Sequence, residues 1–322
     1  MRARVAWLTE AASALYIGVI ALVAQSTGLF YVLFPELGAL GHDILKRPNG
    51  TWGRAPLMLV VTPFLTALAG TLITRHLPYG VVAVLLDVGC SVLIIGALRS
   101  PIAPAISAGL LPLCLGVRSW GYPPSLLVGT GLLAAIAIVR TKLQKSTAAA
   151  DAGAHDLADD IVEEAPPDYS WVPLFAAFVV VAAAASVITG WRLVLFPPLV
   201  VIAFEAFAHT PVCPWAERPV ALVLACGLCA LGGVLSVYYL GAGPLGAMCS
   251  MLAGSAVLRA LALRVPPALA VGLLPFVMPH AGIEFPLAVT LGTALQSAVF
   301  IVWRWITVPR MANAGQGGGM PE

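Results

Sequence analysis

The sequence predicts an all-α fold, a polytopic membrane helical bundle of two tandem repeats, and composition is the first observation behind this prediction. Of the 322 residues, 60% are hydrophobic and only 10% are charged, and the mean hydropathy is +0.96. An ordinary soluble domain has about 25% charged residues. A water-soluble core cannot hold this much apolar sequence, so the lipid bilayer is the expected partner of the chain.

The second observation is the division of the apolar sequence into twelve segments at charged and Pro-rich breaks. They lie near 5–25, 27–42, 56–74, 79–98, 101–117 and 122–139, and then near 171–190, 193–208, 219–240, 244–263, 266–281 and 286–307. A membrane-spanning helix needs about 20 residues. The short segments that begin near 27, 101, 193 and 266 are therefore expected to be tilted, broken or re-entrant.

The third observation is an internal repeat. Leu33-Phe34-Pro35 recurs as Leu195-Phe196-Pro197, and Gly109-Leu-Leu-Pro112 recurs as Gly272-Leu-Leu-Pro275, at an offset that differs by a single position between the two matches. An even number of segments in each copy predicts parallel repeats related by an axis along the membrane normal, with a solute site between them.

These observations divide the chain into four parts. Residues 1–143 are expected to form the first membrane repeat and residues 171–311 the second. The acidic linker 144–170 is expected to be a flexible cytoplasmic tether, and the Gly-rich tail 312–322 to be disordered.

The distribution of Lys and Arg predicts the orientation. If all twelve segments cross, only Arg75, Arg118 and Arg192 lie on the side opposite to both termini. Positive residues accumulate in cytoplasmic loops. We therefore expect a multi-pass protein of the cell (inner) membrane with both termini in the cytoplasm, and leave open whether it forms a homo-oligomer.

Several function classes are disfavoured. Basic residues are scattered singly, so nucleic acid is not an expected partner. No zinc helix, nucleophile elbow or other catalytic motif is present, so we expect no enzyme activity, no metal and no cofactor. Cys226 and Cys229 lie within an apolar segment and are interpreted as small packing residues.

Asp87 is the clearest candidate for a functional residue, because an ionisable group inside the bilayer is costly. It lies well away from both ends of its apolar segment. Ser91, four residues later, lies on the same face of the helix. The two interpretations are a carboxylate that carries protons or contacts the substrate, and a structural hydrogen bond between helices.

Further charged residues lie in the second segment of each copy. In the first copy these residues are Glu36, His42 and Asp43. In the second copy they are Glu205 and His209, and Glu205 corresponds in position to either His42 or Asp43. A carboxylate near an imidazole suits a proton relay or a cation gate. The alternative is charge that reaches water near a cytoplasmic end.

Two Pro-containing stretches predict helix breaks. One runs from Arg99 through Pro101, Pro104 and Ser107, and the other from Arg264 through Pro266-Pro267. The free amides of a helix start bind anions. Two such starts, each near an Arg, are expected to hold a small anion, or else each Pro pair only kinks a packed helix.

The order of segments in each copy resembles the HPP family of membrane proteins. The His-Pro-Pro motif of that family corresponds to Ser100-Pro101-Ile-Ala-Pro104-Ala105 and Val265-Pro266-Pro267-Ala268, and both stretches lack the histidine. The resemblance implies a membrane bundle and transport of nitrite. The six-segment unit is also similar to fusaric-acid-resistance type exporters, which usually carry a large soluble domain.

The expected function is therefore transport of a small solute, by a secondary transporter or a channel, with a small anion such as nitrite as the first candidate. The alternatives are a proton-coupled exporter of organic or aromatic acids, and a membrane scaffold or assembly subunit that transports nothing.

Overall fold

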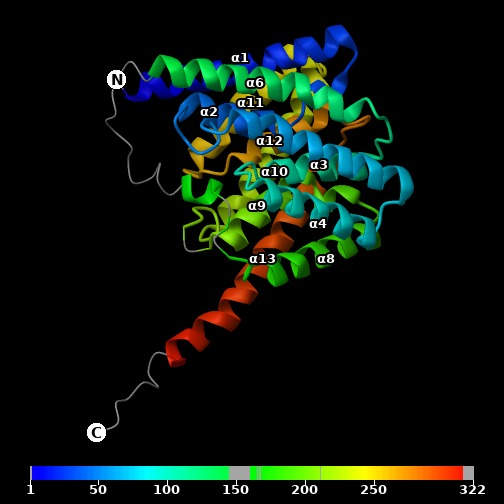
Figure 1. Cartoon of the computed structure of the whole chain (residues 1–322), viewed down its shortest axis with the longest axis vertical. Helices are drawn as coiled ribbons and strands as arrows, with labels where there is room; N and C mark the ends of the chain where they lie inside the picture. Colours follow the sequence, from blue (N-terminus) through cyan, green and yellow to red (C-terminus); the bar gives the residue numbers. More distant parts are fainter. Residues whose placement is uncertain (1, 145–159, 165, 167, 211, 315–322) are drawn as a thin grey trace.

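The computed structural model describes residues 2–144, 160–164, 166, 168–210 and 212–314, and within these ranges it contains helices and no strand (Figure 1). The first half consists of α1 (Arg2–Thr27), η1 (Phe30–Val32), α2 (Leu37–Lys46), α3 (Pro56–His76), α4 (Val81–Leu98), α5 (Ala105–Leu115) and α6 (Tyr122–Gln144). The second half consists of α8 (Val172–Thr189), η2 (Arg192–Leu195), α9 (Pro197–Ala208), α10 (Pro219–Leu240), α11 (Pro244–Ala260), α12 (Pro267–Leu273), η3 (Leu274–Phe276) and α13 (Glu284–Ala314).

Seven of the described helices are long and apolar enough to cross a bilayer, namely α1, α3, α4, α6, α8, α10 and α13. Each contains an apolar stretch of 18 to 22 residues. The prediction of an all-helical membrane protein is confirmed to this extent. The tail 315–322 and the linker residues 145–159, for which we expected disorder and flexibility, lie outside the described residues.

Five of the described helices fall short of a full crossing: α11, with 17 residues, by a little, and four others by much more. α2, α5, α9 and α12 have 10, 11, 12 and 7 residues, which gives at most about 18 Å at about 1.5 Å per residue. The hydrocarbon core is about 30 Å thick. The broken helices expected near 27, 101, 193 and 266 are thus confirmed, and 3-10 turns or Pro-containing loops adjoin them.

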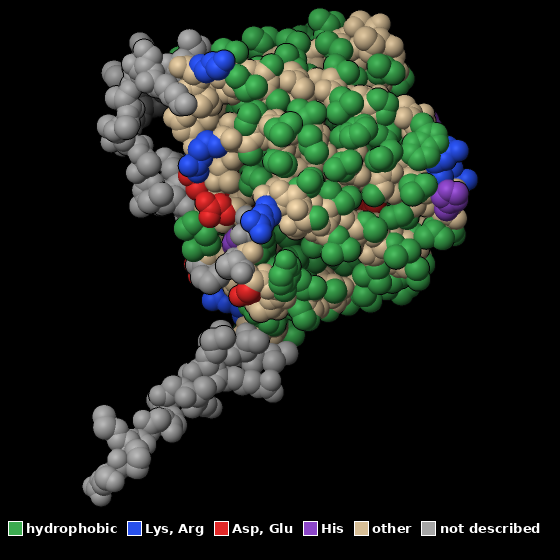
Figure 2. Space-filling model, viewed as in Figure 1, with side chains coloured by type: hydrophobic (Ala, Val, Ile, Leu, Met, Phe, Trp, Pro, Cys, Tyr) green, Lys and Arg blue, Asp and Glu red, His purple; other side chains and the backbone are tan. Residues whose placement is uncertain are grey.

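The charged ends of the helices collect at two opposite ends of the molecule. At one, here called the linker end, Arg259 of α11 pairs with Glu10 of α1, and Arg140 of α6 donates to the carbonyl oxygen of Leu45 at 2.9 Å. At the opposite end, Arg75 stacks on Trp120 and Arg192 on Tyr79. Figure 2 shows hydrophobic side chains across the face between these two edges.

The two halves are intertwined. α1 of the first half packs against α11 of the second, and α8 of the second packs against α4 of the first. The short helices also cross between the halves, because α5 packs on α9 and α12 packs on α2. The interface between the halves therefore combines long helices, above all α1 with α11, with pairs of short helices.

Glycines allow the closest approach of helices within each half. A Cβ atom added at Gly70 of α3 would lie 2.0 Å from the carbonyl oxygen of Gly109 in α5. A Cβ atom at Gly233 of α10 would lie 2.2 Å from the carbonyl oxygen of Gly272 in α12. Small residues at such contacts let backbones touch, so Gly70 and Gly233 serve the packing of these helices.

Candidate functional site

Asp87 lies on α4 where that helix faces α3 and α5. Its side chain is fully buried, and neither carboxyl oxygen has a hydrogen-bond partner among the described residues. A Cβ atom at Gly70 would lie 2.8 Å from Oδ1 of Asp87, and one at Gly109 would lie 2.4 Å from Oγ of Ser91. The structure thus places Asp87 and Ser91 together on one face, as predicted, against two glycines.

Ser250 on α11 corresponds to Asp87, at the same offset that separates Gly109 from Gly272. Its hydroxyl donates to the carbonyl oxygen of Gly272 at 2.7 Å. An ionised carboxylate at Asp87, the corresponding residue of the first half, has no proton to donate. When Asp87 takes up a proton, its carboxyl group can donate a hydrogen bond, as the hydroxyl of Ser250 does.

The ends of α2 and α9 carry matching charged pairs. Arg47 follows α2 and donates its backbone N–H to the carbonyl oxygen of Asp43 at 2.7 Å, and His209 follows α9 and donates to that of Glu205 at 3.0 Å. The second pair follows the first at the offset of the repeated Leu-Phe-Pro motif. Glu205 and His209 thus have the same spacing and the same backbone hydrogen bond as Asp43 and Arg47.

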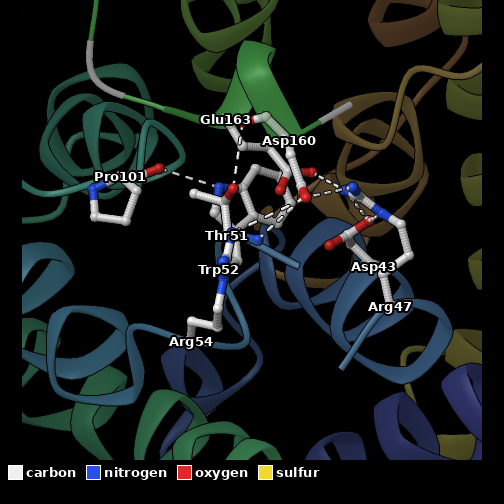
Figure 3. Close-up of polar contacts among 8 residues, drawn as sticks. All are labelled: Asp43, Arg47, Thr51, Trp52, Arg54, Pro101, Asp160 and Glu163. Atoms are coloured by element: carbon white, nitrogen blue, oxygen red, sulfur yellow. Dashed lines mark hydrogen bonds and ion pairs between the residues drawn. The ribbon is translucent and has the colours of Figure 1, made fainter. Parts of the chain in front are cut away.

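Arg47 is the centre of an ion-pair cluster at the linker end (Figure 3). Its guanidinium lies 2.6 Å from Oδ1 of Asp43 and 2.9 Å from Oδ1 of Asp160, and it also pairs with Glu163. The Arg47 side chain is only 8% exposed. Asp160 and Glu163 belong to the linker, so this part of the expected flexible tether is bound to the bundle in the structure.

The described part of the linker, residues 160–164, is here called the linker segment. Residues 160–163 are helical, and Val162 and Glu163 are buried. Thr51 donates its backbone N–H to Oδ1 of Asp160 at 3.1 Å, and its hydroxyl lies 3.2 Å from the carbonyl oxygen of the same residue. The segment is held by both its side chains and its backbone.

Burial raises the pKa of Glu163 well above the ordinary range, and Asp43 acts in the same direction while Arg47 opposes it. Glu205 and Asp160 also raise this pKa, and His209 lies on the neighbouring α9 end with its own pKa lowered by burial. A carboxyl whose pKa is higher when docked takes up a proton on docking. Docking of the linker segment is therefore expected to weaken as pH rises through the raised pKa of Glu163.

This pH dependence can be measured with a fluorophore on Ile161→Cys in a chain whose native cysteines are replaced, since the Ile161 side chain is 45% exposed. The anisotropy is expected to fall as the pH is raised, and the part of this change that depends on Glu163 is expected to be absent in Glu163→Gln. The variant keeps every other titratable group, including His209. Identical profiles for the two proteins would contradict the prediction.

Glu36 lies at the start of α2, deep in the interface between the halves. It is fully buried, neither carboxyl oxygen is hydrogen-bonded within the described residues, and Ser107 of α5 lies beside it. Glu205 on α9 is close enough to act on it electrostatically. The structure thus gathers Glu36, Ser107, Glu205 and Asp43 around the short helices.

The structure does not bring Arg99 into this region. Arg99 is exposed at the linker end of α4, in the left-handed conformation at φ 48°. It follows Asp87 by twelve positions, which is about 18 Å along a helix. Arg264 is likewise exposed, so the two arginines lie at the surface and not beside Asp87.

The Pro residues do begin helices, as predicted. Pro104 and Pro266 precede the first residues of α5 and α12, and Pro267 is the first residue of α12. The carbonyl oxygen of Pro101 accepts a hydrogen bond from the Trp52 indole at 3.0 Å. This contact ties the loop before α5 to the loop before α3.

The sequence interpretation missed the role of Arg47, Asp160 and Glu163. The spacing of Asp43 and Arg47 at four residues was the available signal, because such pairs meet on a helix. Nothing in the sequence showed that linker acids would reach the same guanidinium.

Comparisons of the chain with protein-family models, with curated proteins and with solved structures find no match.

Proposed function

We propose that the protein is a secondary transporter of a small solute, formed by two parallel tandem repeats, in which buried carboxyl groups carry protons. The observation that carries the proposal is the set of buried carboxyls in the bundle. Glu36 and Asp87 have no hydrogen-bond partner for either oxygen among the described residues, and Oε2 of Glu205 has none. Unpaired carboxylates are too costly in this environment to serve packing alone.

The order of elements supports the two repeats. Each half contains a long helix, a 3-10 turn, a short helix, two further helices, a second short helix and a final long helix. Arg99 and Ala262, which correspond at the offset that separates Gly109 from Gly272, have left-handed φ values of 48° and 46° after α4 and α11. The helix ends at Arg47 and His209, which correspond at the offset of the Leu-Phe-Pro motif, also have similar φ values of -127° and -125°.

The charges inside the bundle bear on the substrate. Five carboxylate residues are buried within the described ranges, and the nearly buried side chain of Arg47 pairs with two of them, Asp43 and Glu163. A negative interior repels an anion unless protons accompany it. The small anion that we favour, nitrite by resemblance to the HPP family, would therefore move together with protons. In this proposal both termini face the cytoplasm.

The test uses purified protein in liposomes with a pH-sensitive dye inside. An inward nitrite gradient is expected to acidify the lumen faster than in protein-free vesicles, which report leakage of nitrous acid. Glu205→Gln and Asp87→Asn are expected to reduce the rate to that of protein-free vesicles, because an amide cannot carry a proton.

Glu217→Gln is the matched control, since Glu217 is an exposed carboxylate at the linker end. It is expected to transport at the unmodified rate. Flux of organic or aromatic acids without nitrite flux would favour the exporter. Absence of flux for nitrite, other small anions and organic acids, with or without a pH gradient, would overturn the proposal and leave the scaffold.

A further inference from the structure

The linker segment contacts both halves of the protein. In the first half, Asp160 and Glu163 pair with Arg47 at the end of α2, and Asp160 also accepts a hydrogen bond from Thr51. In the second half, the backbone of Glu164 lies close to the imidazole of His209 at the end of α9. The segment therefore bridges the two equivalent helix ends.

The groups beneath the segment are those that the proposed transport mechanism uses. Glu205 is 1% exposed, and Glu163 is close enough to act on both Glu205 and Asp43 electrostatically. Cys213, in the loop that follows α9, is 2% exposed. Glu205 is close enough to act electrostatically on its thiol. Glu163 of the linker thus lies beside a buried acidic region.

The docked state is held by contacts that oppose one another. Three carboxylates surround the guanidinium of Arg47, and Oε2 of Glu163 has no hydrogen-bond partner among the described residues. The attraction within a buried ion pair is largely offset by the cost of taking its charges out of water. Such a contact can be released by a small change in charge, whereas an apolar contact of the same size cannot.

We propose that the linker segment is a latch, which closes the linker end of the interface between the two halves and releases it when the Arg47 cluster opens. Docking of the linker segment can be measured without any transport assay. The role of the latch as an inner gate rests on the proposed function. The closed latch keeps water from Glu205 and Asp43, and the open latch exposes them.

The test measures the accessibility of Cys213 to a membrane-impermeant maleimide, in a chain whose other five cysteines are replaced by alanine or serine. Asp160→Asn removes a linker charge from Arg47 and is expected to raise the labelling rate severalfold. Asp168→Asn is the matched control, because the carboxylate of Asp168 accepts its hydrogen bonds from Ser170. The control is expected to label at the unmodified rate.

A second variant keeps the test valid if the charge changes disturb folding. A disulfide between Thr51→Cys and Asp160→Cys, two residues in contact, is expected to hold the latch closed and to slow labelling of Cys213. Reduction of that disulfide leaves a protein without the Asp160 carboxylate, so the labelling rate should rise above that of the locked protein. Equal labelling of locked, unmodified and charge-neutralised proteins would overturn the latch.

Transport assays on the same variants separate the two proposals. If the latch is a gate, the locked protein loses flux while the reduced protein regains it. Protection of Cys213 by the lock in a protein that shows no flux for any solute would refute the transporter and leave the latch standing. Unchanged flux in the locked protein would overturn the role of the latch as a gate.

Discussion

Gly70→Ala is expected to produce one of the two largest losses of stability in this protein. The added methyl group would lie 2.0 Å from the carbonyl oxygen of Gly109 and 2.8 Å from Oδ1 of Asp87. The nearest obstacle is backbone, which cannot rotate away, so α3 and α5 must separate. Overpacking of this kind costs about 1–3 kcal/mol. The apparent melting temperature of purified protein in detergent, followed by size-exclusion chromatography, measures the loss.

Gly89→Ala is the matched control on the neighbouring helix. A Cβ atom at Gly89 meets nothing within 4 Å, and alanine favours a helix over glycine by about 1 kcal/mol. We expect the melting temperature of this variant to stay the same or rise. Gly233→Ala, whose Cβ would lie 2.2 Å from the carbonyl oxygen of Gly272, should resemble Gly70→Ala. Equal stability of Gly70→Ala and Gly89→Ala would contradict the packing argument.

The helical class and the broken helices could be predicted because both depend on local sequence. Apolar runs of about 20 residues require helices in a bilayer, and Pro residues set the starts of α5 and α12. The intertwining of the halves could not be predicted in the same way. Packing of α1 on α11 and of α8 on α4 depends on contacts between residues far apart in the chain.

The candidate site was predictable only in its members. Asp87 and Glu205 stood out because a charge in an apolar segment is rare. The sequence could not show that Arg99 would be exposed at the surface, because the place of a residue beyond a helix end depends on the next loop. It also hid the docked linker segment, since its acidic composition is the one expected of a disordered tether.

Arg47→Ala is expected to produce the other large loss of stability, about 3–5 kcal/mol, because it removes one partner of a buried ion-pair cluster. Asp43 and Glu163, whose side chains are each 5% exposed, would be left without a cation and would have to take up protons or leave their sites. The melting temperature in detergent should fall accordingly. The linker segment should undock first, because two of the three carboxylates belong to it.

Arg54→Ala separates this effect from a general loss of positive charge at the same loop. The Arg54 side chain is 59% exposed and lies 4.0 Å from Oδ2 of Asp160. An exposed pair contributes about 0–1 kcal/mol, so this variant should melt close to the unmodified protein. Adding Asp160→Asn and Glu163→Gln to Arg47→Ala should restore part of the stability, since the remaining cost comes from carboxylates without a cation. If the triple variant melts no higher than Arg47→Ala, the loss comes from the packing of the arginine stem and not from its charge.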